Sequence, residues 1–356
     1  MLKSCRTWLV LAGICVMALA APCQAAFQDP LDIPAVHSKL APKGVINGLA
    51  FAGKRMVSVG QRGHILYSDD AGQNWIQANV PVSTDLTAVF FASSTRGWAV
   101  GHDGVVLTTT DAGGNWVKQL DGRSVGKLMA SHYADHSPDG MSAGQLTQLR
   151  ADAARFAEEG PDKPFLDLWF ESETTGYIVG LFNMVFKTSD GGATWIPWFD
   201  RTDNPKLFHF YAIRSVGGEL YLAGEQGMVL KLDKAAQRFK QTPVDYQGTF
   251  FGITGKSGAV IVYGLRGNAY RSVNNGATWQ KIETGVTVGL TGARVMQDGR
   301  ILLVSQAGQV LASSDDGLSF TRLKLDRQVP AAALLETPGN SLVMGGMRGL
   351  HSLAIK

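Results

Sequence analysis

The stretch TTTDAGGNW at residues 108–116 recurs along the chain in related forms. Its relatives are SDDAGQNW (68–75), TSDGGATW (188–195), SVNNGATW (272–279) and SSDDGLSF (313–320). Side-chain oxygens such as those of Thr109 and Asp111 can accept hydrogen bonds from nearby backbone N–H groups, which favours a tight turn. The glycine permits a reversed backbone, and the aromatic residue begins the next strand and packs on its neighbours. The motif therefore predicts a turn between two strands of a repeated unit.

A second motif accompanies the first and has seven copies. It is a short apolar run ending in Gly, two variable residues, a second Gly and another apolar run, as in VSVGQRGHILYS (57–68) and WAVGHDGVVLTT (98–109). The second Gly falls at positions 63, 104, 227, 267, 308 and 349, with Asn183 in the third copy, and Asn tolerates positive φ next best after Gly. A period of about 40–45 residues with several strands per unit is typical of a β-propeller blade. The sequence predicts an all-β, seven-bladed β-propeller of four-stranded blades.

The repeat boundaries divide residues 26–356, a single propeller, into segments. The expected blades are 44–80, 84–120, 165–200, 206–242, 247–283, 287–325 and 329–356. The seventh copy stops after its third strand, so we expect an N-terminal segment, 31–43 and chiefly Ile33–Leu40, to supply the missing strand and close the ring. Residues 121–164 interrupt the pattern as a helical insertion, with a helix that Ser142 caps and Gly160-Pro161 ends.

The first residues have the pattern of an export signal. Lys3 and Arg6 precede an apolar run from Trp8 to Ala21 and a small-residue exit, which predicts a signal peptide at 1–25 and an extracytoplasmic mature chain. All three Cys (5, 15 and 23) lie in this segment, so the mature chain has no disulfide and no thiolate metal site. Its charge is nearly balanced, which gives no reason to expect nucleic acid, and no later stretch is apolar for long enough to span a membrane.

Alternate turns of a propeller lie on opposite faces, so the GxxG turns share one face with the connections between blades. These turns place exposed side chains on that face, and the connection at 196–208 adds an aromatic and a cation. The candidate partner-binding residues are Arg62, Arg266, Arg348, Asp103, Gln226, Phe182, Trp198 and Arg201. We interpret the arginines as a basic patch that receives carboxylates of a partner; the alternative is that Arg is merely a soluble turn residue.

The Asp-containing turns are expected to be structural. Their motif residues are Asp70, Gly72, Trp75, Asp111, Gly113, Trp116, Asp190, Gly192, Trp195, Asn274, Gly276, Trp279, Asp315, Gly317 and Phe320. His132 and His136 have metal-ligand spacing, but Ser137-Pro138 and the lack of a third ligand favour a flexible loop. We therefore expect no metal and no other cofactor.

Two families carry these motifs. The Ser/Thr-x-Asp-x-Gly-x-x-Trp turns resemble the Asp-box, or bacterial neuraminidase repeat, which marks architecture and not activity. VGHDGVVLTTTDAGGNW (100–116) and VGLFNMVFKTSDGGATW (179–195) resemble the photosystem II stability/assembly factor family of extracytoplasmic seven-bladed propellers. That resemblance implies a non-catalytic, monomeric helper that holds a subunit of a membrane protein complex through an Arg-rich face. A transporter is the other kind of membrane partner that we consider.

Two alternatives remain at this stage. A sialidase-type glycoside hydrolase needs three Arg, a Tyr activated by a Glu and an acid. Its usual Arg-Ile-Pro signature is replaced here by DIPAVHSKL (32–40), and Tyr263, the one Tyr beside a GxxG turn, occupies a strand-core position. A glycan-binding propeller without catalysis would use exposed aromatics such as Trp198 or Phe199.

Overall fold

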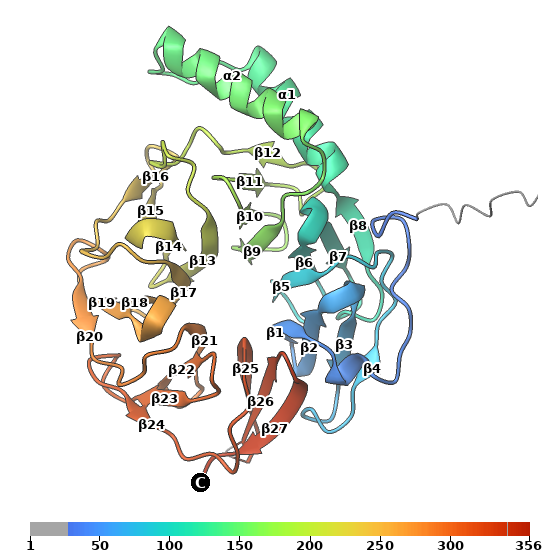
Figure 1. Cartoon of the computed structure of the whole chain (residues 1–356), viewed down its shortest axis with the longest axis vertical. Coiled ribbons are helices and arrows are strands. Elements are labelled where there is room, and N and C mark those ends of the chain that lie inside the picture. Colours follow the sequence, from blue (N-terminus) through green and yellow to red (C-terminus); the bar gives the residue numbers. More distant parts are fainter. Residues whose placement is uncertain (1–27, 340) are drawn as a thin grey trace, which may run out of the picture.

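The computed structural model describes residues 28–339 and 341–356. These residues form seven antiparallel sheets arranged around a central axis (Figure 1). The predicted seven-bladed β-propeller is therefore confirmed. The expected signal peptide, 1–25, lies outside the described residues.

The strands follow one another from the axis outward within each blade. Blade 1 contains β1 (Ile46–Ala52), β2 (Arg55–Gly60), β3 (Ile65–Ser68) and β4 (Ile76–Gln77). Blade 2 contains β5 (Leu86–Phe91), β6 (Gly97–Gly101), β7 (Val106–Thr109) and β8 (Val117–Leu120), and blade 3 contains β9 (Phe165–Phe170), β10 (Gly176–Gly180), β11 (Val185–Thr188) and β12 (Ile196–Pro197). Blade 4 contains β13 (Phe210–Val216), β14 (Glu219–Gly224), β15 (Val229–Asp233) and β16 (Arg238–Gln241).

The last three blades complete the ring. Blade 5 contains β17 (Phe250–Lys256), β18 (Ala259–Gly264), β19 (Ala269–Ser272) and β20 (Gln280–Ile282), and blade 6 contains β21 (Leu290–Val295), β22 (Ile301–Ser305), β23 (Val310–Ser313) and β24 (Thr321–Arg322). Blade 7 has three strands, β25 (Ala333–Thr337), β26 (Ser341–Gly346) and β27 (Gly349–Ala354). Short 3-10 helices precede β1 and connect the second and third strands of four blades: η1 (Ala41–Lys43), η2 (Gln61–Gly63), η3 (His102–Gly104), η4 (Glu225–Gly227) and η5 (Leu265–Gly267).

The Asp-containing turn between β7 and β8 shows how one short motif builds a strand connection. Thr109 Oγ1 donates to Asp111 Oδ1 (2.8 Å) and accepts from the Gly113 N–H (3.1 Å). Asp111 Oδ1 also accepts from the Asn115 N–H (3.0 Å), and Trp116 Nε1 donates to the Gly113 carbonyl (3.0 Å). The side chains thus satisfy backbone groups that no strand ladder reaches, which fixes the turn wherever the motif is repeated.

Blades are joined to one another by polar side chains near the axis. Asn47 of blade 1 donates to the Leu86 carbonyl of blade 2 (2.8 Å), and Thr87 donates to the Phe165 carbonyl of blade 3 (2.7 Å). Apolar packing between the sheets supplies most of the contact, as at Trp98, which is fully buried and stacks on the Phe170 ring of the next blade with centroids 3.6 Å apart. Because each blade leaves an apolar face uncovered, only a closed ring buries all of them.

The second glycine of the GxxG turns is required because the chain entering the next blade passes directly against it. A Cβ on Gly63, whose φ is +69°, would lie 2.1 Å from the Val82 carbonyl oxygen, on the connection from blade 1 to blade 2. A Cβ on Gly349 of blade 7 would lie 2.2 Å from the carbonyl oxygen of Pro42. Pro42 therefore occupies, for the last blade, the place that a connection to a following blade occupies elsewhere, and β1 packs against β25 beside it.

The expected N-terminal closing strand is wrong. Residues 33–40 form no strand, and the segment lies along the outer side of blade 1 before the chain reaches η1 beside β27 (Figure 1). There Ala35 N–H donates to the Val80 carbonyl (3.0 Å) and Ser83 N–H donates to the Pro30 carbonyl (2.8 Å). The outer edge of β27 meets residues that follow blade 6 instead, through a bridge between Leu325 and Ile355.

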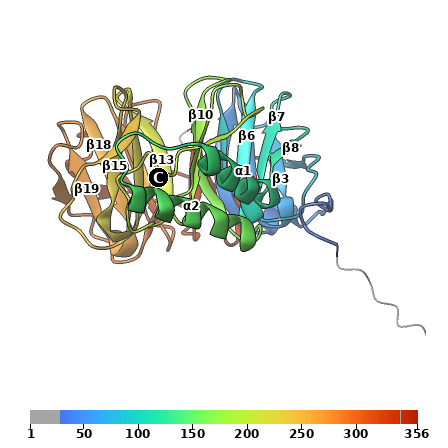
Figure 2. The same ribbon diagram turned by 90° about the horizontal axis from the view of Figure 1, so that it is seen from above.

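The insertion between blades 2 and 3 is a helical hairpin. It consists of α1 (Gly122–Asp135) and α2 (Ala143–Glu158), and Ser142 caps α2 as expected, with a reciprocal bond from Gln145. The flexible loop expected around His132 is wrong, because His132 lies in α1 and His136 caps its end. As expected, the hairpin begins on the face of the GxxG turns, where α1 contacts η3, the GxxG turn of blade 2. It then extends along the rim, where α1 also contacts β12 of blade 3 (Figure 2).

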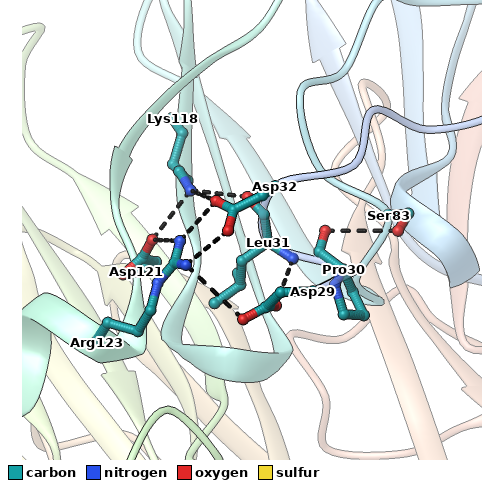
Figure 3. A network of polar contacts seen from close by, with 8 residues as sticks. All are labelled: Asp29, Pro30, Leu31, Asp32, Ser83, Lys118, Asp121 and Arg123. Carbon is teal, nitrogen blue, oxygen red and sulfur yellow. Dashed lines mark hydrogen bonds and ion pairs between the residues drawn. The ribbon is translucent and has the colours of Figure 1, made fainter. Parts of the chain in front are cut away.

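A polar network fastens the N-terminal segment to the start of this hairpin (Figure 3). Arg123 Nη1 donates to Asp32 Oδ2 (2.7 Å), and Arg123 Nη2 donates to Asp121 Oδ2 (2.7 Å). Lys118 Nζ donates to the Leu31 carbonyl (2.8 Å) and also pairs with Asp121 (3.0 Å). Arg123 lowers the pKa of Asp32 to about 2, so the carboxylate remains charged at any physiological pH. The segment that begins at residue 28 is thereby held against blades 1 and 2.

Candidate functional site

The three arginines that the sequence singles out are all exposed, but only two of them share a sector of the ring. Arg62 and Arg266 have φ values of 56° and 57°, so the turns of blades 1 and 5 present them in the same way. Arg348 lies in a two-residue turn between β26 and β27 and is not among the residues with positive φ, so the expected common direction does not extend to it. Blades 7 and 1 are neighbours, whereas blade 5 is separated from blade 7 by blade 6.

Further basic residues gather where blade 7 meets blade 1. The Cα of Lys43 would lie only 2.6 Å from a Cβ on Gly349, so Lys43 is beside the turn that carries Arg348. We call Lys43, Arg62 and Arg348, with His64 and His351 next to them, the closure seam. Sequence reasoning missed Lys43, because it precedes the first repeat and only ring closure brings it to Arg348.

The closure seam has positive charge with no internal partner. The side chains of Lys43, Arg62 and Arg348 make no hydrogen bond or ion pair with any residue in the described ranges. Burial lowers the pKa of His64 and His351, and the neighbouring Arg62 and Arg348 respectively lower it further. Both imidazoles are therefore neutral near pH 7, and the charge of the seam comes from the Lys and Arg side chains.

The expectation that Trp198 and Phe199 are exposed is wrong, since each has 5% of its surface exposed. Trp198 packs edge-on against the rings of Tyr177 and Phe239, with centroids 5.3 and 6.3 Å away. Arg201 is not a free cation either. Its guanidinium lies 5.2 Å above the Trp198 ring and donates to the Gln237 carbonyl (3.4 Å).

The remaining turn residues differ in their exposure and in their side-chain contacts. Gln226 is exposed, and its side chain makes no hydrogen bond with any residue in the described ranges. Asp103 is half-buried and accepts a hydrogen bond from the Thr84 hydroxyl. Phe182 is 39% exposed, with its ring edge-on to His209 at 4.6 Å. These three residues stay predictions as partner contacts, as do Arg62, Arg266 and Arg348.

Neither a metal-binding cluster nor a membrane-spanning helix is found among the described residues. No group of three or more His, Cys, Asp or Glu in the described ranges is placed to hold a metal ion. His132 and His136 lie side by side with ring centroids 4.9 Å apart, but no third ligand joins them there. No described helix combines the length and apolar character that spanning a membrane requires.

A cavity of about 620 Å³ follows the central axis. The inner strand of every blade contributes to its wall, which includes Asp167, Arg214, Arg294 and Tyr263. Tyr263 is 5% exposed, and burial raises the pKa of its hydroxyl above the ordinary value even though Arg214 lowers it. A phenol in this state is harder to ionise, which is the reverse of what a sialidase nucleophile needs.

Comparisons with known proteins identify the repeat. A family model described as photosynthesis system II assembly factor YCF48 matches residues 157–311. A curated protein of Synechococcus sp. (strain CC9902), photosystem II assembly lipoprotein Ycf48, is 26% identical over 156 residues. The resemblance to the photosystem II assembly factor family is confirmed. That match covers 43% of this chain and 46% of the relative, so it spans less than half of either protein.

Solved structures of this family have the same fold. The structure titled YCF48 bound to D1 peptide superposes with a TM-score of 0.61 at 16% identity, covering 91% of this chain and 99% of that one. YCF48 from Cyanidioschyzon merolae gives 0.59 at 15% identity, covering 88% and 96%. The WD40 β-propeller domain of Doa1 also gives 0.59, at 11% identity, covering 91% and 96%. Because a propeller outside the family scores equally well, these superpositions bear on the fold alone.

Proposed function

We propose that this protein is a non-catalytic propeller scaffold that binds a protein partner through the closure seam, and that the partner is a subunit of a membrane protein complex. The observation that carries the proposal is the group of unpaired cations on neighbouring blades, Lys43, Arg62 and Arg348. The family resemblance supports the assembly role, and one related structure has a peptide of the protein D1 as its bound partner.

The chemistry of the seam suits an acidic or carboxylate-bearing segment. A guanidinium binds a carboxylate through two parallel hydrogen bonds, and it does so without first breaking an internal ion pair when it has none. Exposed cations on one sector also speed encounter with a negatively charged partner. Contacts of this kind are individually weak, which fits a helper that must release its client after assembly.

The location belongs to the same proposal. A signal peptide at 1–25 would export the chain to the periplasm, or to the lumen of a photosynthetic compartment. Residues 26–356 contain no Cys, so the fold needs no disulfide and is insensitive to the oxidising conditions outside the cytoplasm. A transporter encoded in the same host remains the other membrane partner that this role would serve.

The test is affinity purification of the tagged protein from the native membrane. Reversal of the seam charges in Arg62→Glu/Arg348→Glu should release the partner, and Arg266→Glu tested alone should show whether blade 5 contributes. Lys54→Glu/Arg322→Glu is the matched control, because both residues are exposed cations without described partners that lie outside the GxxG turns. An unchanged list of partners in the seam variant would remove the closure seam from the proposal.

The non-catalytic part of the proposal has its own assay. Incubation of the purified protein with a fluorogenic sialoside should give no turnover above the buffer blank. Turnover that disappears in Tyr263→Phe or Arg294→Gln would instead support a hydrolase and overturn the scaffold assignment.

A further inference from the structure

The central cavity contains two arginines that line the same wall but differ in what surrounds them. Arg214 of blade 4 forms an ion pair with Asp167 of blade 3 and donates to its own neighbour, the Ile213 carbonyl (2.6 Å). Asp167 is satisfied in turn, because it also accepts from the Ile213 N–H (2.8 Å). This pair joins two blades and leaves neither charge available to a ligand.

Arg294 of blade 6 has no such partner. Its guanidinium lies 5.3 Å from the ring centroid of Phe51 in blade 1, and it makes no hydrogen bond or ion pair within the described chain. Glu336 is the acidic group that influences it, but no ion pair forms, and Glu336 Oε2 accepts from the Gln297 N–H (2.8 Å) instead. Burial lowers the pKa of Arg294, as expected for a cation removed from water without a counter-charge.

Aromatic residues line the cavity into which Arg294 is built. Phe51, Phe90 and Trp169 line the same cavity from blades 1, 2 and 3, and all of them lie near the ends of their inner strands. Arg294 also lies near the end of its strand, β21, so this group is closer to the face of the Asp-containing turns than to the GxxG face. The wall carries two Arg and one Asp, a net positive charge.

We propose that the central cavity binds an organic carboxylate with an aromatic or apolar body, with Arg294 as the group that receives the carboxylate. The anion supplies the two hydrogen bonds that the guanidinium lacks, and the body packs against Phe51 and Trp169. The carboxylate belongs either to a free organic acid or to the end of a peptide chain, because both present the same group. This site is separate from the closure seam, and the two can fail independently.

Binding is tested with 3-phenylpropanoate and its amide, 3-phenylpropanamide, by ligand-observed NMR on the mature protein. The acid should bind at least tenfold more tightly than the amide, and Arg294→Gln should weaken acid binding at least tenfold. Arg294→Gln breaks no hydrogen bond, so the variant should keep the thermal midpoint of the parent. Arg294→Lys keeps the charge without the planar fork and should give intermediate affinity.

Two further arms separate the seam from the cavity and a free acid from a peptide terminus. Arg62→Gln should leave acid binding unchanged. A short peptide ending in Phe with a free carboxylate is compared with its C-terminal amide, to show whether chain ends enter the cavity. The proposal is supported if 3-phenylpropanoate binds alone or if both 3-phenylpropanoate and the peptide carboxylate bind. The proposal would be overturned if 3-phenylpropanoate and its amide bound equally well, if the Arg294→Gln variant bound the acid as tightly as the parent, or if neither 3-phenylpropanoate nor the peptide carboxylate bound.

Discussion

Ring closure at Gly349 can be tested by adding a single methyl group. Gly349 has a φ of +84°, and a Cβ placed there would lie 2.2 Å from the Pro42 carbonyl oxygen and 2.6 Å from the Lys43 Cα. Gly258, in the turn between β17 and β18, is the matched control: its φ is +86°, and nothing lies within 4 Å of the position of its Cβ. Both Gly→Ala variants force Ala into the left-handed region, but only one of them pushes two chain segments apart.

The expected difference follows from these two terms. Left-handed backbone costs Ala about 1–2 kcal/mol, which should be the whole loss of unfolding free energy in Gly258→Ala. Overpacking against backbone adds about 1–3 kcal/mol, because Pro42 and Lys43 cannot rotate away as a side chain would. Gly349→Ala should therefore lose about 2–5 kcal/mol.

Equilibrium unfolding in urea, followed by tryptophan fluorescence, measures both variants under the same conditions. Hydrogen exchange should in addition increase at residues 41–46 in Gly349→Ala and remain unchanged there in Gly258→Ala. Equal losses of unfolding free energy, with no local increase in exchange, would show that Pro42 does not close the ring against blade 7.

Three further predictions concern the turns, the insertion and the N-terminal segment. Hydrogen bonds from Thr194 lower the pKa of Asp190 from its ordinary value of 3.8 to about 2, so the stabilisation from this carboxylate is present above about pH 4 and is lost as the pH falls toward 2. Asp190→Asn, which copies Asn274 of blade 5, should therefore reduce the difference between urea midpoints measured at pH 5 and pH 2.5. Tyr133→Phe removes the hydroxyl that donates to the buried Asp200 carboxylate (2.6 Å) and should lower the unfolding free energy, measured in urea, by about 1–3 kcal/mol. A change of less than about 0.5 kcal/mol would contradict this role. Arg123→Gln should make residues 28–36 more sensitive to protease while lowering the unfolding free energy by less than about 1 kcal/mol, because its ion pairs are partly exposed.

The fold could be predicted from the sequence because its two repeated motifs each encode a turn through local chemistry. Thr109 and Asp111 bond to backbone groups within their own turn, so the signal does not depend on distant residues. The helix α1 escaped prediction for the opposite reason. A Cβ on Gly126 would lie 2.6 Å from the Ala157 Cα, so this glycine, which disfavours a helix by itself, is needed for close packing against α2.

The site could be predicted only in part. Arg62 and Arg348 can be predicted as candidate site residues from their positions in the turns. The position of Lys43 beside them depends on a contact between the two ends of the chain, which no local pattern shows. Trp198 was expected to be exposed because it lies in the long connection at 196–208, and no local pattern shows that Tyr177 and Phe239 enclose it. Arg294 carries no motif at all, because its isolation depends on which residues surround it in space.

The contact between Pro42 and Gly349 also constrains the order in which the molecule is made. It joins a residue near the start of the folded chain to one in the final strand, so no stretch of intermediate length can form it. Pro42 must therefore wait for its contact on blade 7 until synthesis has reached β27, and such distant pairings form slowly. A polypeptide cut short before Gly349 lacks the partner that Pro42 has on blade 7, so completion of the circle itself distinguishes a finished molecule from a truncated one.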